Sequence, residues 1–221
     1  MGFEPQPEVF TRAFKVKGNI VHGVVGLLLF IVPLFGGLGG ALLIGRRWGD
    51  AAGLMAMVGA LLLTAAGIYL GHQKVLLIYN SGLRRDLAAA LARRLGRNPD
   101  DGRAYFVGWA PGLGFNPKDG DTDHDVGFLT LAPEAMTFFG DTTAFQLHRG
   151  QVYTVECKQA GIPIIMDMGF RIGVYWLDAY GQQQAFTLER REGRNRSEVR
   201  RNTKQLAELL QQWRDYGFVP Q

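Results

Sequence analysis

The chain has 221 residues, a mean hydropathy near zero, a formal net charge of +4 and a pI near 9.3. This length allows one modest soluble domain beside a membrane segment. The single cysteine, Cys157, excludes an intramolecular disulfide bond.

Two uncharged stretches, 19–45 and 51–71, contain no Asp, Glu, Lys or Arg. A helix needs about 20 apolar residues to cross about 30 Å of hydrocarbon, so each stretch is long enough to span a membrane. The short turn Arg46–Asp50 joins them. We therefore expect a transmembrane helical hairpin over 18–80, preceded by a cytoplasmic lead-in over 1–17 in which residues 8–17 form an amphipathic helix.

Basic residues flank both outer ends of the hairpin, at Arg12, Lys15 and Lys17 and again from Lys74 onward, whereas the turn carries only Arg46 and Arg47. The positive-inside rule then places both termini in the cytoplasm, with the hairpin in the cell membrane. Small residues four apart, as in Gly36 and Gly40, allow helices to approach closely. Either the two spans pack on each other, or they contact a membrane partner or a second copy.

We predict a basic amphipathic linker helix within residues 81–98. The helix itself runs from Gly82 to Leu95, with Ser81 as its N-cap. Leucine recurs at every fourth position from Leu83 to Leu95, and the other faces carry Arg84, Arg85, Arg93 and Arg94. Such a helix can lie on anionic headgroups or dock its leucines on the soluble domain.

Residues 99–221 change to period-two alternation, which is typical of strands. We predict strands near 103–109, 126–132, 135–140, 143–148, 151–158, 170–178 and 183–190. Residues 160–168 suit an edge strand or a covering loop. A last helix, from about Ser197 to Tyr216 and capped by Ser197 or Asn195, carries one apolar face that we expect to include Trp213 and Tyr216.

The segment GFLTLAPEAMTFFGD from Gly127, followed by FQLH from Phe145 and VYTVE from Val152, resembles the opening hairpins of bacterial PH-like and GRAM-like domains. The turn at Ala132 and Pro133 departs from the Thr-x-x-Arg start that is common there. The resemblance implies a mainly-β PH-like barrel of about seven strands, closed by a C-terminal amphipathic helix. It implies a scaffold and no particular reaction.

Four carboxylates alternate in one short loop, at Asp119, Asp121, Asp123 and Asp125. Alternating carboxylates can converge on a hard cation such as calcium, although His124 and Thr130 stand where an EF-hand has Gly and Glu. The alternative is a solvated acidic loop that faces basic residues elsewhere. Apart from this divalent cation, no cofactor is indicated.

Basic residues supply the remaining candidate site. Arg84, Arg85, Arg93 and Arg94, together with Arg194 and Arg196, are the candidate contacts for anionic lipid headgroups or a protein partner; the alternative is a solvated surface with local ion pairs. No nucleic-acid motif accompanies the charge, and no catalytic motif is present, so we expect neither nucleic-acid binding nor enzyme activity. The expected function is a membrane-anchored binding or scaffold module; the alternative is an accessory subunit of a membrane enzyme or transporter.

Overall fold

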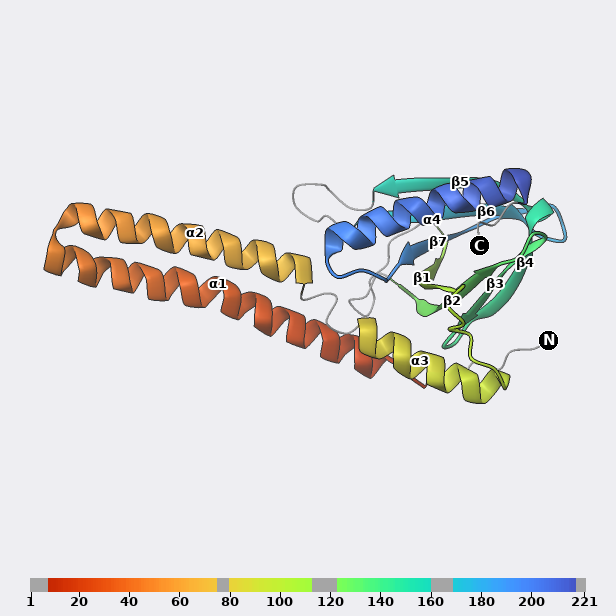
Figure 1. Cartoon of the computed structure of the whole chain (residues 1–221), viewed down its shortest axis with the longest axis horizontal. Coiled ribbons are helices and arrows are strands. Elements are labelled where there is room, and N and C mark those ends of the chain that lie inside the picture. The colour runs from red at the N-terminus through yellow and green to blue at the C-terminus, as the bar shows by residue number, and fades with distance from the viewer. Residues whose placement is uncertain (1–7, 75–79, 113–122, 160–168, 218–221) are drawn as a thin grey trace.

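The computed structural model describes residues 8–74, 80–112, 123–159 and 169–217. A long helix pair, α1 (Arg12–Trp48) and α2 (Asp50–Lys74), is followed by α3 (Asn80–Leu95), seven strands and α4 (Arg196–Tyr216). The helix pair extends away from the sheet, and α3 and α4 lie on opposite sides of it (Figure 1).

The first helix begins later than the sequence predicts and continues further. Thr11 is its N-cap, because the Thr11 Oγ1 accepts the backbone N–H of Phe14 at 3.2 Å, and residues 8–10 bend before it. The expected lead-in helix over 8–17 is therefore wrong as a separate element: its second half belongs to α1. One helix runs from the polar lead-in through the whole first apolar stretch.

Glycines bring α1 and α2 into close contact. A Cβ atom on Gly53 would lie 2.8 Å from the Cα of Gly45, and one on Gly37 would overlap the side chain of Ala60. The two apolar stretches thus pack on each other, as the first of the two interpretations expects. The contact does not use Gly36 and Gly40, because a Cβ atom on either would meet nothing within 4 Å.

All seven predicted strands are present, with boundaries within two residues of those expected. They form one open antiparallel sheet in the order β4-β3-β2-β1-β7-β6-β5. The largest shift is in β1, because the Asp101 carboxylate accepts the N–H of Arg103 at 2.9 Å and holds that residue in the preceding turn. The strands are β1 (Tyr105–Pro111), β2 (Asp125–Leu131), β3 (Ala135–Gly140), β4 (Ala144–His148), β5 (Val152–Gln159), β6 (Phe170–Leu177) and β7 (Gln183–Arg190).

The main core lies between one face of the sheet and α4. Strand residues such as Val107, Leu129 and Ile172 meet Leu210 and Trp213 of the helix there, all fully buried. The helix begins at Asn195, whose side chain accepts the N–H of Glu198, and ends at Gly217 in the left-handed region. Tyr216, expected on its apolar face, is exposed, because it lies in the last turn, beyond the sheet contact made by Trp213.

The opposite face of β1 and β2 is covered by α3. Phe106 and Phe128, which alternate with the inward residues of the same strands, pack against the α3 leucines Leu83, Leu87 and Leu91. The leucine stripe therefore docks on the soluble domain, which decides between its two predicted positions. The helix begins at Asn80, two residues before the predicted start.

The outer edge of β5 is covered by α4. Gln211 donates to the Val155 carbonyl at 3.0 Å and Arg214 donates to the Tyr153 carbonyl at 3.3 Å. In the same turn of the helix, the Trp213 indole N–H donates to the Ala132 carbonyl at 2.7 Å, on the β2–β3 turn. These contacts protect an edge that would otherwise be open to pairing with another chain. The segment 160–168, predicted as edge strand or loop, lies outside the described residues.

Candidate binding site

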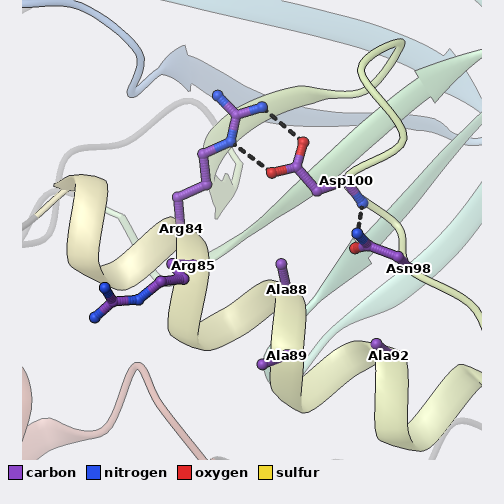
Figure 2. Close-up of a pocket in the computed structure, with 7 residues that line it drawn as sticks. All are labelled: Arg84, Arg85, Ala88, Ala89, Ala92, Asn98 and Asp100. Carbon is purple, nitrogen blue, oxygen red and sulfur yellow. Dashed lines mark hydrogen bonds and ion pairs between the residues drawn. The ribbon is translucent and has the colours of Figure 1, made fainter.

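Arg84, the first predicted basic residue of α3, is held by two carboxylates. Its guanidinium makes a two-point contact with Asp100, at 2.9 and 2.7 Å (Figure 2). It also lies 2.8 Å from Glu192, in the connection between β7 and α4. The hydrogen bond to Asp100 raises the pKa of Arg84 against the opposing effect of burial. Arg84 therefore ties α3 to the chain that follows it and to the β7–α4 connection.

The neighbouring arginines of α3 differ in how far their side chains are exposed to solvent. The side chains of Arg85 and Arg93 are 82% and 73% exposed, and their acidic partners, Asp86 and Glu8, lie 3.3 Å away. Arg94 instead turns inward and donates to the Asp141 carbonyl at 2.8 Å. Exposed ion pairs of this kind contribute about 0–1 kcal/mol, so Arg85 and Arg93 can exchange their partners for a ligand at little cost.

A pocket of about 430 Å³ lies on α3 beside Arg84 and Asp100. The methyl groups of Ala88, Ala89 and Ala92 line one side of it, and Asn98 and Asp100 line the other (Figure 2). Its volume is in the range of small-ligand sites. Arg85 also lines it, so the pocket suits an apolar group that ends in an anion.

The two arginines at the start of α4 do not form one face with those of α3. Arg194 is exposed, whereas burial lowers the pKa of Arg196. Arg84 contacts Glu192, two residues before Arg194, so the beginnings of α3 and α4 are near each other. Arg93 follows Arg84 by nine residues, or about 14 Å along the helix axis. The six predicted arginines thus divide into a group near the β7–α4 connection and a group at the far end of α3.

Of the four predicted metal-binding carboxylates, Asp119 and Asp121 lie outside the described residues. Asp123 is fully buried and contacts Arg171 at 2.7 Å and Arg191 at 2.6 Å. Burial by itself raises the pKa of Asp123, but the charges and hydrogen bonds of the two arginines outweigh it and lower the pKa below its ordinary value. This carboxylate is a structural anion, and the expectation of a solvated loop is wrong at this position.

Asp125 is also buried, and it binds backbone groups. Its carboxylate accepts N–H groups of Val126, Asp141, Thr142 and Thr143 at 2.7–3.2 Å, and so fixes the β3–β4 turn. Burial raises its pKa, while the hydrogen bonds from the backbone act in the opposite direction. Within 8–74, 80–112, 123–159 and 169–217, no three His, Cys, Asp or Glu side chains converge as metal ligands.

Sequence reasoning missed the buried charge cluster around Asp123. Arg171 lies within the largely buried strand β6, and Glu189 of β7 lies 3.3 Å from it. Arg171 alternates with the core residue Ile172, so it lies on the face of the sheet opposite the main core. A charged residue between apolar residues of a strand requires a partner if its own face is covered, and this was the available signal. No family model and no curated protein matches the sequence.

Proposed function

We propose that the protein is an integral membrane protein, anchored by α1 and α2, whose sheet domain is a non-enzymatic binding module on the cytoplasmic side. The observation that carries this proposal is the exposure of the helix pair. Both helices are long and apolar enough to cross a membrane, yet only 6% and 11% of their most apolar windows are buried within the protein. Such continuous apolar surface is unstable in water and matches a lipid environment.

The arrangement of the charges supports the orientation. The α1–α2 turn, with Arg46 and Arg47, lies at the end of the helix pair away from the sheet domain (Figure 1). The larger set of basic residues lies at the domain end, including Lys15 and Lys17. Both termini are then cytoplasmic.

The strand order supports a PH-like scaffold. One open sheet of seven antiparallel strands, with a C-terminal helix across its core face, has the element order that the resemblance implies. On such a scaffold the function depends on the surface and not on the fold. The exposed Arg85 and Arg93, with the adjacent pocket, are the surface that suits a protein partner or anionic lipid headgroups.

A second candidate function is supported by glycines that face away from α2. A Cβ atom on Gly36, Gly39 or Gly40 would meet nothing within 4 Å, whereas Gly37 and Gly45 are used in the α1–α2 contact. Small residues on an outer face allow another helix to approach closely. This favours an accessory subunit that packs on a larger membrane protein.

Two experiments test these proposals. An alkaline carbonate wash of membranes should leave the full-length protein in the pellet; its release into the supernatant would refute the membrane anchor. Purification in mild detergent, with identification of retained proteins and lipids, then compares the wild type with R85Q/R93Q and the charge-matched control R46Q/R47Q. We expect only R85Q/R93Q to lose the retained component, and equal loss in both variants would reject the α3 surface.

A further inference from the structure

The residues just before and at the start of α1, Glu8–Lys15, form a strap across the boundary between α3 and the sheet. The carboxylate of Asp141, which is fully buried, accepts three successive backbone N–H groups of this strap, from Glu8, Val9 and Phe10, at 3.2, 3.2 and 2.9 Å. The carbonyl of Asp141 accepts from Arg94 of α3 at 2.8 Å. One residue of the β3–β4 turn therefore binds both the strap and α3.

The side chain of Phe10 fills the boundary itself. It is 4% exposed and belongs to the same apolar cluster as Leu87 of α3 and Phe128 of β2. Lys15 and Arg191 lie over its ring, at 4.5 and 5.3 Å from the centroid. The ring is thus shared between α3 and the sheet, and α3 loses part of its apolar contact if the strap leaves.

Lys15 connects the strap to the membrane helix. Its ammonium group donates to the carbonyls of Asp123 and His124, at 3.3 and 3.2 Å, at the entry to β2. Because α1 is one continuous helix from Arg12 to Trp48, Lys15 belongs to the same helix as the apolar stretch. A displacement of α1 along or about its axis is therefore transmitted to the strap.

We propose that the strap is a clamp that couples the position of α1 to the docking of α3. With the strap seated, α3 is fixed on the sheet and its leucine stripe is covered. When α1 withdraws the strap, Asp141 loses three donors, Phe10 leaves its site, and the docking of α3 on the sheet loosens, with Leu87 and Leu91 partly uncovered while Arg84 still holds the start of the helix. The clamp consists of contacts within this chain and needs no bound ligand, so the inference does not rest on the proposed binding function.

Hydrogen exchange of the full-length protein in detergent tests the clamp. In D141N, one acceptor oxygen is replaced by an amide that cannot accept the strap N–H groups. We expect the amides of 83–91 to exchange at least tenfold faster, with those of 172–188 unchanged. The matched control is D178N, because Asp178 also accepts backbone N–H groups, at the β6–β7 turn far from the strap; this variant should leave 83–91 as in the wild type.

A milder variant, K15Q, keeps the test possible if D141N does not fold. It should speed the hydrogen exchange of the amides of 83–91 about threefold. In the C157S background, spin labels on exposed sites Leu27 and Tyr180 report the position of α1 relative to the sheet. We expect a single narrow distribution of the distance between the two spin labels in the parent protein and a broad distribution in K15Q. Unchanged exchange and an unchanged distance would overturn the clamp, as would equal acceleration of 83–91 and 172–188, since α3 would then not be released separately.

Discussion

Replacing Asp123 with Asn tests the buried charge cluster that joins β2, β6 and β7. The side chain of Asp123 is fully buried, and those of Arg171 and Arg191 are only 9% and 13% exposed. D123N keeps the shape but removes the anion, so two nearly buried cations lose their main partner; Arg171 retains the Glu189 carboxylate, at 3.3 Å, and its hydrogen bond to the Thr187 hydroxyl. Removal of one partner from a buried pair costs about 3–5 kcal/mol.

That loss is a large part of the 5–15 kcal/mol by which domains are usually stable. At roughly 4 °C per kcal/mol, the unfolding midpoint should fall by about 10–20 °C. The assay is thermal unfolding of the full-length protein in detergent, followed by tryptophan fluorescence, since Trp213 is fully buried in the sheet domain. The control D178N changes an exposed turn and should shift the midpoint by a few degrees at most. A D123N shift no larger than that of D178N would refute the structural role of the cluster.

The pH dependence of unfolding is a second measurement of the role of Asp123 in the buried charge cluster. The pKa of Asp123 is lowered in the folded state relative to its ordinary value of 3.8. Its stabilisation is therefore complete above the unfolded pKa and is lost as the pH falls through the folded pKa. The wild type should lose stability below about pH 4, and D123N should lack this component of the acid slope. An identical slope in both proteins would contradict the ion pairing.

Three further substitutions have distinct expected outcomes. G108A places a methyl group inside the space of the Asp123 carboxylate, so it should lower the unfolding midpoint about as much as D123N, and the double variant should be little worse than either alone. W213F removes a buried indole and its hydrogen bond to the β2–β3 turn, and should cost about 2 kcal/mol; because it also removes the fluorescent reporter, thermal unfolding of this variant and of the wild type is followed by circular dichroism. G53L adds a side chain where the Cβ atom alone would lie 2.8 Å from the Cα of Gly45, so cysteine crosslinking between α1 and α2 should fall several-fold; undiminished crosslinking would show that the helices do not pack through these glycines.

The secondary structure could be predicted from the sequence because its signals are local. Alternation or a short apolar run marks each strand, and Asn195 and Gly217 mark the ends of α4 through capping and a positive φ. The position of α3 could not be predicted in the same way. A leucine stripe such as Leu83, Leu87 and Leu91 suits a membrane surface or a protein surface equally, and only the phenylalanines on the outward face of β1 and β2 decide between them.

The acidic loop shows a second limit of prediction from the sequence. Alternating carboxylates indicate a solvated or metal-binding loop when only neighbours in the sequence are considered. Asp123 is instead paired with Arg171 and Arg191, which lie 48 and 68 positions away, and Asp125 binds a turn 16–18 positions away. Burial of a carboxylate depends on partners that only the sheet register brings together, so local composition cannot predict it.

The arginines of α3 make the same point for function. Arg84 and Arg85 are adjacent in the sequence and carry the same charge, and both were predicted to contact a ligand. Arg84 is held by Asp100 and Glu192, and removing it would take from Asp100 the cation that makes a two-point contact with it and leave Glu192 with Arg190. Arg85 points into solvent beside the pocket, and its ion-pair partner among the described residues is the neighbouring Asp86. Consecutive residues of a helix point about 100° apart, so Arg84 faces the carboxylates of the domain and Arg85 faces solvent. Charge along the sequence therefore locates a basic region, and the partners across the fold decide which of its residues remain available for binding.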